Sequence, residues 1–136
     1  MEFSPIILNK INLQGNSMDS NNKSPENQII QRISLEDTKD IVDNRKEYNI
    51  IIIDIRTPME FQYGHIIDSI NIDFYEHDFI NNLNKLDKTK KYLIYCRHAN
   101  RTSYALQMMR QLGFKYVLEM DMGITYWYQN GWELVY

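Results

Sequence analysis

The sequence predicts one domain of the α/β class with a mostly parallel sheet. Short apolar runs with the character of buried strands alternate along the chain with segments whose apolar residues recur at helical spacing. The strongest run, residues 50–55, is a row of isoleucines without alternation, which is typical of a strand buried on both faces of a parallel sheet. The length of 136 residues is enough for one such domain with its own core.

The first ordered elements are expected after a flexible N-terminal tail, residues 1–27, so that the domain spans residues 28–136. The stretch 16–27 is polar and shows no periodicity. A short strand is expected over residues 28–33. Ser34 can then begin a helix by accepting a hydrogen bond from the N–H of Asp37, and this helix should fray near residues 44–46. Its expected inner face consists of Leu35, Thr38, Ile41 and Val42.

A second helix start follows the isoleucine strand. Thr57 is the predicted cap, Pro58 occupies the first helical position, and Glu60 can bond back to the cap. Gly64 ends this short helix, and a short strand is expected over residues 69–72. The next amphipathic helix is predicted from the spacing of Phe79, Ile80, Leu83 and Leu86.

The central stretch of the chain, residues 92–102, combines an apolar strand at 92–95, a loop that begins with the only cysteine, and the start of a helix. Gly113 is expected to end that helix. Its apolar stripe consists of Tyr104, Ala105, Met108, Met109 and Leu112. A last strand is expected over residues 116–120, followed by an aromatic segment whose two tryptophans, at positions 127 and 132, are expected in the core.

The loop at Cys96 has the features that make a thiol reactive. A loop between a strand and a helix N-terminus directs backbone N–H groups and the positive end of the helix dipole toward one point. Arg97 and Arg101 add positive charge, which favours the thiolate form. The alternative is that a single cysteine after an apolar strand is an inert core residue.

Asp54 interrupts the isoleucine strand near its carboxyl end, the edge at which open α/β sheets bind ligands. A buried aspartate must find hydrogen-bond donors. Asp54 therefore either belongs to the site or only holds the neighbouring loops together.

Composition excludes several functions. The formal net charge of −3 argues against a nucleic-acid partner, and no apolar run is long enough to span a membrane. One cysteine allows no intramolecular disulfide, which favours a reducing, cytoplasmic location. Three scattered histidines and one cysteine form no convincing metal site, so no metal and no cofactor are expected.

Four segments together resemble the rhodanese family of sulfurtransferases. Residues 54–61 resemble its Asp-x-Arg-x-x-x-Glu-[Tyr/Phe] segment, residues 64–72 its Gly-His-Ile segment, residues 96–102 its active-site loop, and residues 122–132 its closing Gly-Gly-x-x-x-Trp segment. They occur in order and at family spacing between residues 28 and 136. The resemblance implies a three-layer α/β/α fold with a five-stranded, mostly parallel sheet.

The resemblance also implies a chemistry. Cys96 would be the catalytic nucleophile that takes sulfur from a small anionic donor, thiosulfate or a persulfide, and passes it to a thiol, cyanide or a protein acceptor. The loop residues are the candidate substrate-binding residues: Arg97, His98, Ala99, Asn100, Arg101 and Thr102. The candidate supporting residues are Asp54, Arg56 and Glu60, and Arg101 is expected to turn inward against Glu60. His98 either binds the anionic substrate or is simply solvated.

Three residues depart from the family pattern at positions where it has glycine: Asp68, Ala99 and Met122. If the loop needs a positive φ at Ala99, backbone strain of about 1 kcal/mol is expected there.

Two other functions remain open. Dual-specificity phosphatases and arsenate reductases place Cys and Arg on a similar loop, but their loop is one residue longer than the one between Cys96 and Arg101, which suits a tetrahedral phosphate. Rhodanese-like domains also serve as non-catalytic interaction modules, usually after loss of the cysteine. The presence of Cys96 favours the enzyme, whereas Ala99 keeps the interaction module open.

Overall fold

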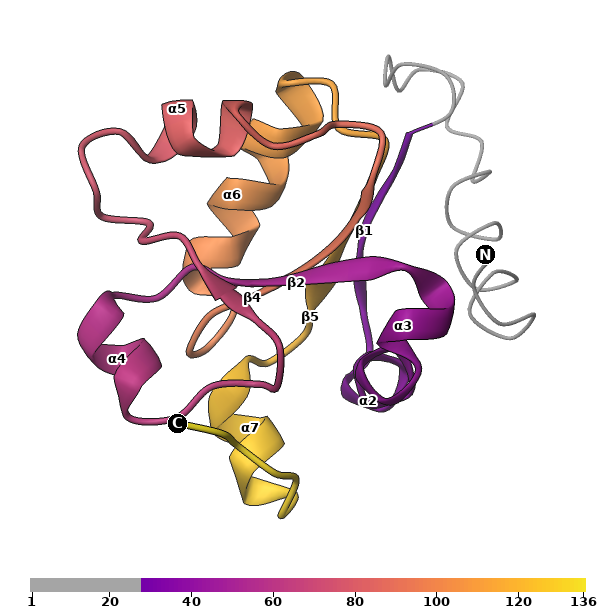
Figure 1. Cartoon of the computed structure of the whole chain (residues 1–136), viewed down its shortest axis with the longest axis vertical. Coiled ribbons are helices and arrows are strands. Elements are labelled where there is room, and N and C mark those ends of the chain that lie inside the picture. Colours follow the sequence, from indigo (N-terminus) through magenta and orange to yellow (C-terminus); the bar gives the residue numbers. More distant parts are fainter. Residues whose placement is uncertain (1–27) are drawn as a thin grey trace.

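The computed structural model describes residues 28–136, and the predicted tail of residues 1–27 lies outside the described residues. The elements, labelled in Figure 1, are β1 (Ile29–Ile33), α2 (Leu35–Asp43), α3 (Arg45–Tyr48), β2 (Ile50–Asp54), α4 (Pro58–Gln62), β3 (Ile70–Asn71), α5 (Phe79–Asn84), β4 (Lys91–Tyr95), α6 (Asn100–Gln111), β5 (Tyr116–Met120) and α7 (Ile124–Gln129). No helix among these is long and apolar enough to cross a membrane.

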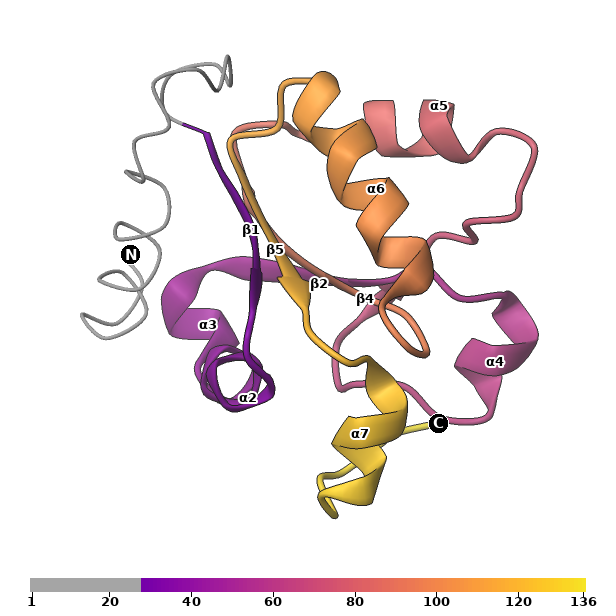
Figure 2. The same ribbon diagram turned by 180° about the vertical axis from the view of Figure 1, so that it is seen from behind.

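The five strands form one sheet in the order β1-β5-β4-β2-β3, and every neighbouring pair is parallel. This confirms the predicted fold class. β4 lies in the middle of the sheet, between β5 and β2. The segments that follow the carboxyl ends of the strands therefore meet at one edge, and Figures 1 and 2 show α4 and α7 at that end of the molecule.

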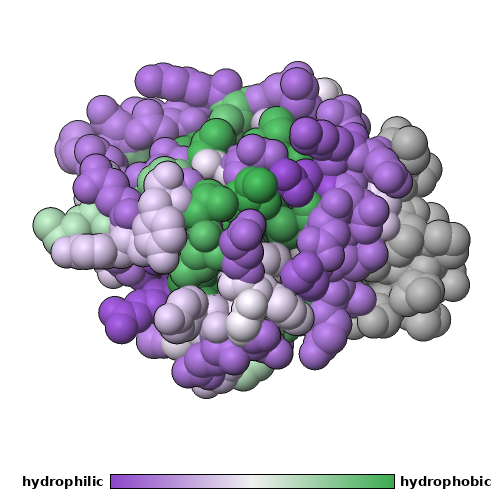
Figure 3. Space-filling model, turned by 60° about the horizontal axis from the view of Figure 1, so that its bottom comes forward, coloured by the Kyte–Doolittle hydropathy of each residue, from purple (hydrophilic) through white to green (hydrophobic). Residues whose placement is uncertain are grey.

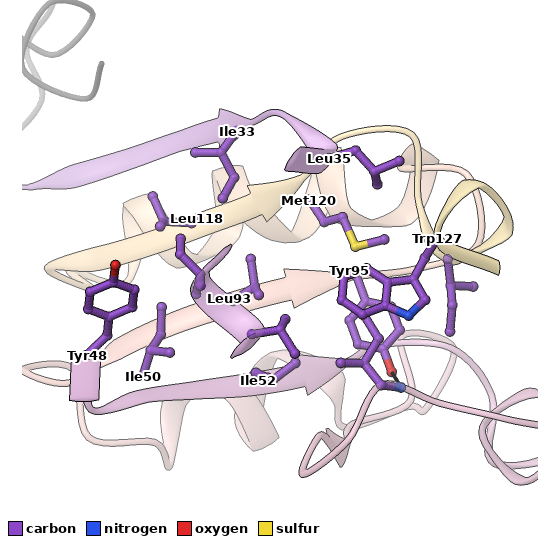
Figure 4. Close-up of a cluster of buried hydrophobic side chains, with 14 residues drawn as sticks. Ile33, Leu35, Tyr48, Ile50, Ile52, Leu93, Tyr95, Leu118, Met120 and Trp127 are labelled. Atoms are coloured by element: carbon purple, nitrogen blue, oxygen red, sulfur yellow. Dashed lines mark hydrogen bonds between the residues drawn. The ribbon is translucent and has the colours of Figure 1, made fainter. Parts of the chain in front are cut away.

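Helices cover both faces of the sheet, as the three-layer prediction requires (Figures 1 and 2). One core cluster joins the sheet to α2, α3 and α7, and it includes Ile50, Ile52 and Trp127 (Figure 4). The other joins the opposite face to α5 and α6 and includes Ile53 and Cys96. Successive residues of β2 thus enter opposite cores, which explains why its sequence is apolar without alternation.

The two predicted caps are present. The Ser34 hydroxyl accepts from the Asp37 N–H at 3.1 Å, and the four residues predicted for the inner face of α2 are its buried ones. Thr57 and Glu60 form the complete capping box of α4. The first helix ends at Asp43, next to the predicted residues 44–46, but a further short helix, α3, which follows Asn44 and buries Tyr48, was missed in the sequence analysis.

Three details of the apolar patterns are also corrected. Tyr104 is 68% exposed, because it lies two residues from the buried Thr102 and Leu106 and so faces the other side of α6. Ile80 is 50% exposed, because the short α5 buries only Phe79 and Leu83. The expected strand over residues 69–72 is reduced to the two residues of β3.

Candidate active site

Cys96 directly follows the central strand β4, and it is only 1% exposed. Three residues later Ala99 occupies the N-cap position of α6, where its methyl side chain makes no capping hydrogen bond. The first hydrogen bond of the helix runs from the Ser103 N–H to the Ala99 carbonyl at 3.3 Å. The N–H groups before Ser103 have no acceptor within the helix, so they and the helix dipole can stabilise negative charge beside the sulfur.

The start of α7 holds this loop from behind. The N–H of Ile124 donates to the Cys96 carbonyl at 2.9 Å, and the N–H of Thr125 donates to the Arg97 carbonyl at 3.4 Å. Gly123 makes this approach possible. A methyl group at Gly123 would overlap the carbonyl of Arg97 and lie 2.7 Å from the His98 nitrogen. The backbone of the loop is therefore fixed by a contact that only glycine allows.

Each of the three residues that replace a family glycine has a positive φ. The value is 63° at Asp68, 70° at Ala99 and 65° at Met122. This is a conformation that glycine adopts easily and other residues adopt at a cost. Ala99 has the positive φ that was considered for it, so backbone strain of about 1 kcal/mol lies within the loop that follows Cys96.

Arg101 turns inward and pairs with Glu60 on α4, as expected. Its Nη1 and Nη2 atoms donate to the two carboxylate oxygens at 2.8 and 3.0 Å. The hydrogen bond from Arg101 is the main reason why the pKa of Glu60 falls from 4.5 to about 2, against a smaller opposing effect of burial. The pKa of Arg101 is raised, first by the same hydrogen bond and then by the charge of Glu60, with a smaller contribution from the nearby Cys96 sulfur. The pair thus braces the loop and places positive charge near the sulfur.

This pair makes stability depend on pH. A carboxyl group with a lowered pKa in the folded state stabilises the protein above its unfolded pKa, and this contribution is lost as the pH falls. For Glu60 the loss is expected between pH 4.5 and about 2. Because the pair is partly exposed, the expected loss is only about 1–2 kcal/mol.

Chemical denaturation between pH 6 and pH 2 measures this contribution. The Glu60→Gln variant should lack this part of the acid-induced loss of stability. Identical pH dependence of the native protein and Glu60→Gln would show that the pair does not stabilise the loop.

Thr102 occupies a different place from the one expected of a substrate-binding residue. Its hydroxyl is buried, lies 3.7 Å from the Cys96 sulfur, and donates to the carboxylate of Glu119 at 2.6 Å. Glu119 is 2% exposed and also accepts from Nε of Arg32 at 3.1 Å. Glu119 was missed in the sequence analysis. Glu119 is a single carboxylate within an apolar strand, residues 116–120, and the same kind of signal in residues 50–55 had drawn attention to Asp54.

Asp54 and Arg56 form a buried ion pair at the carboxyl end of β2. Nε and Nη2 of Arg56 donate to the two carboxylate oxygens of Asp54 at 3.0 and 2.7 Å. Nη2 also donates to the Gly64 carbonyl at 2.7 Å, and the Asn71 amide donates to the carbonyls of both residues of the pair. These contacts join the loop after β2 to the end of α4 and to β3. In the structure Asp54 therefore holds neighbouring segments together, which is the second of the two roles considered for it.

Tyr95, the residue before the cysteine, extends this support. Its hydroxyl accepts from the Ile66 N–H at 3.0 Å and lies 3.0 Å from the Ser69 hydroxyl. Burial, followed by the charge of Asp54, raises the pKa of Tyr95. The residue therefore stays neutral and connects β4 to the segment that precedes β3.

The other loop residues lie at the surface. Arg97, His98 and Asn100 are exposed, and Nε2 of His98 lies 3.2 Å from the Thr125 hydroxyl. A cavity of about 330 Å³ adjoins the loop, with its lining contributed by Arg32, His98, Ala99, Asn100, Ser103, Asp121, Met122 and Tyr126. Figure 3, which brings the end with α4 and α7 forward, shows hydrophobic residues at the surface among hydrophilic ones. In residues 28–136 no three His, Cys, Asp or Glu side chains are placed to hold a metal ion.

Comparison with known proteins identifies a family, related sequences and solved structures that are similar to this chain. The Rhodanese-like domain family matches residues 34–130. The GlpE thiosulfate sulfurtransferase of Ectopseudomonas mendocina is 30% identical over 98 residues, which are 71% of this chain and 84% of that protein. A protein of Synechocystis sp. is 29% identical over 91 residues, which are 64% of this chain but only 48% of that protein.

A solved structure shows the same arrangement. The rhodanese-related protein of Thermoplasma volcanium superposes with a TM-score of 0.66 at 30% sequence identity. The match covers 77% of this chain and 97% of that one. The likeness therefore extends over nearly the whole of the solved domain.

Proposed function

This chain belongs to the rhodanese-like domain family, and from that premise we propose that it is a sulfurtransferase that carries sulfur as a persulfide on Cys96. The relatives named as thiosulfate sulfurtransferases support the reaction class. The observation that carries the proposal is the place of Cys96 between the end of the central strand and the N-terminus of α6.

The first step loads the cysteine. The Cys96 thiolate attacks the outer sulfur of thiosulfate and forms a sulfur–sulfur bond. The bond between the outer sulfur and the sulfonate sulfur breaks, and its electron pair leaves with sulfite. The negative charge then lies on the outer sulfur of the persulfide, where N–H groups at the start of α6 can stabilise it.

The second step unloads it. The acceptor, a thiolate or cyanide, attacks the outer sulfur, and the bond between that sulfur and Cys96 breaks. Its electron pair returns to Cys96 as the thiolate, so the cycle needs no external oxidant or reductant. A protein thiol can serve as the acceptor in the same way.

The exposed loop residues suit an anionic donor. Arg97 places a cation at the rim, and His98 and Asn100 offer hydrogen-bond donors beside it. The guanidinium of Arg101 is held by Glu60, so Arg101 supports the loop and does not reach out to the donor as Arg97 does. The cytoplasmic location expected from the single cysteine remains a prediction.

Turnover tests the proposal. The native protein, supplied with thiosulfate and cyanide, is expected to form thiocyanate, and Cys96→Ser is expected to form none, because a hydroxyl cannot store sulfur in this way. Circular dichroism of both proteins controls for folding. Absence of turnover with thiosulfate and with a persulfide donor would favour the interaction module instead.

A further inference from the structure

A chain of hydrogen bonds links the Cys96 sulfur to a carboxylate that lies outside the loop. The sulfur is 3.7 Å from the Thr102 hydroxyl, and that hydroxyl is 2.6 Å from Oε2 of Glu119. Glu119 in turn is held by Arg32, its direct cross-strand partner on β1. The Ser103 hydroxyl lies 3.2 Å from the same carboxylate and 2.8 Å from the Ala99 carbonyl. The sulfur and the carboxylate thus share one hydroxyl between them.

The chemistry of these groups determines the direction of the bonds. A carboxylate can only accept hydrogen bonds, and a threonine hydroxyl has only one proton to donate. Thr102 donates that proton to Glu119, so toward Cys96 it presents lone pairs. A thiol can donate to them, whereas a thiolate would meet both the lone pairs and the nearby negative charge of Glu119.

The charged groups around Cys96 are the exposed Arg97, which follows it in the loop, and residues from three further elements. Arg32 comes from β1, Glu119 from β5 and Arg101 from α6, while Asp121 reaches the site through its ion pair with Arg32 at 3.6 Å. The pKa of Arg32 is raised chiefly by its hydrogen bond to Glu119, and the charges of Glu119 and Asp121 make smaller contributions. The pair of Arg32 and Glu119 is therefore linked to the Cys96 sulfur through the Thr102 hydroxyl.

We propose that Glu119 is a positioning residue that fixes the Thr102 hydroxyl and thereby holds the resting Cys96 sulfur as the thiol. It opposes the two arginines and the N-terminus of α6, which favour the thiolate. The thiol proton must leave before the sulfur can attack a donor, so Glu119 sets the pH range in which the loop becomes nucleophilic. The proposal rests on the proposed function only in taking Cys96 as the nucleophile.

The pH profile of alkylation tests this proposal without any sulfur donor. Cys96 is the only cysteine, so the mass gained from iodoacetamide reports on it alone. In Glu119→Gln the pH at which alkylation reaches half of its maximal rate is expected to fall by about one unit. At a pH below both midpoints, the variant should then be alkylated about tenfold faster than the native protein. The matched control is Glu47→Gln, the same change at an exposed position on α3, which should leave the profile unchanged. An unchanged or higher midpoint in Glu119→Gln would overturn the proposal.

A double-mutant cycle tests the route through Thr102. Thr102→Val removes the shared hydroxyl, so the shift caused by Glu119→Gln should be less than half as large in that background. Equal shifts in the two backgrounds would show that the hydroxyl has no part in the effect, and would overturn the positioning role.

A third variant keeps the test valid even if Glu119→Gln does not fold. Arg32→Gln changes a half-exposed side chain and removes positive charge from the pair. Its midpoint should rise, with alkylation at pH 7 at least threefold slower than in the native protein. A midpoint that does not rise would contradict the coupling between this pair and Cys96. Because no sulfur is transferred in these experiments, failure of turnover and failure of this proposal remain distinguishable.

Discussion

Replacement of Asp54 by Asn is expected to lower the free energy of unfolding by about 3–5 kcal/mol, which is the usual cost of breaking a buried ion pair from one side. Asp54 is fully buried, and Arg56 contacts it with Nε, with Nη2 and with its backbone N–H at 2.9 Å. An asparagine is neutral and can accept only through its single oxygen, so the Arg56 guanidinium would remain buried without a counter-charge. Denaturant titration measures the loss.

Asp68→Asn is the matched control for this prediction. Asp68 also pairs with an arginine, Arg45, at 2.8 Å, but its side chain is 57% exposed. Surface ion pairs contribute less than about 1 kcal/mol, and asparagine tolerates the positive φ of this position. Equal losses of unfolding free energy in the two variants would show that burial does not increase the contribution of the pair of Asp54 and Arg56 to stability.

Gly123→Ala is expected to cost about 3 kcal/mol of stability and to slow sulfur loading of Cys96 about tenfold or more. The added methyl group would collide with the backbone at Arg97 and His98, which cannot rotate away as a side chain would. Either α7 or the loop must move, and the hydrogen bond from Ile124 to the Cys96 carbonyl is lost with it. Displacement of a nucleophile by about 1 Å is enough to reduce rates strongly.

Gly131→Ala separates the collision from backbone strain. Gly131 has a φ of +78°, close to the +84° of Gly123, but an added methyl group there would meet no atom within 4 Å. Its replacement should cost only about 1 kcal/mol and leave sulfur loading unchanged. If Gly123→Ala behaves like Gly131→Ala, the contact between α7 and the loop does not fix the loop.

The fold was predictable because local signals agreed with burial. The isoleucines of β2 enter both cores, and Ser34 and Thr57 cap helices where their side chains can reach the N–H groups. The errors in the apolar stripes arose because the spacing of apolar residues does not show which neighbouring elements cover a helix. Tyr104 belongs to an apolar stripe, yet only neighbouring elements decide which side of α6 is covered.

The site was predictable only where its residues follow one another or match a family segment. The pair of Arg101 and Glu60 was expected in this way and is present. Glu119 was missed because its partner Arg32 is distant in the sequence, and only the register of β1 on β5 places the two side by side. The available signal was that β1 and β5 each carry one charged residue of opposite sign. That signal predicts a pair only when the order of the strands in the sheet is known.

Intact mass after exposure to thiosulfate tests the central claim most directly. The native protein is expected to gain the mass of one sulfur atom, to lose it again on addition of cyanide, and to gain none as Cys96→Ser. A folded native protein that gains no sulfur from thiosulfate or from a persulfide donor, or a Cys96→Ser variant that gains as much, would contradict the assignment of Cys96 as the sulfur carrier.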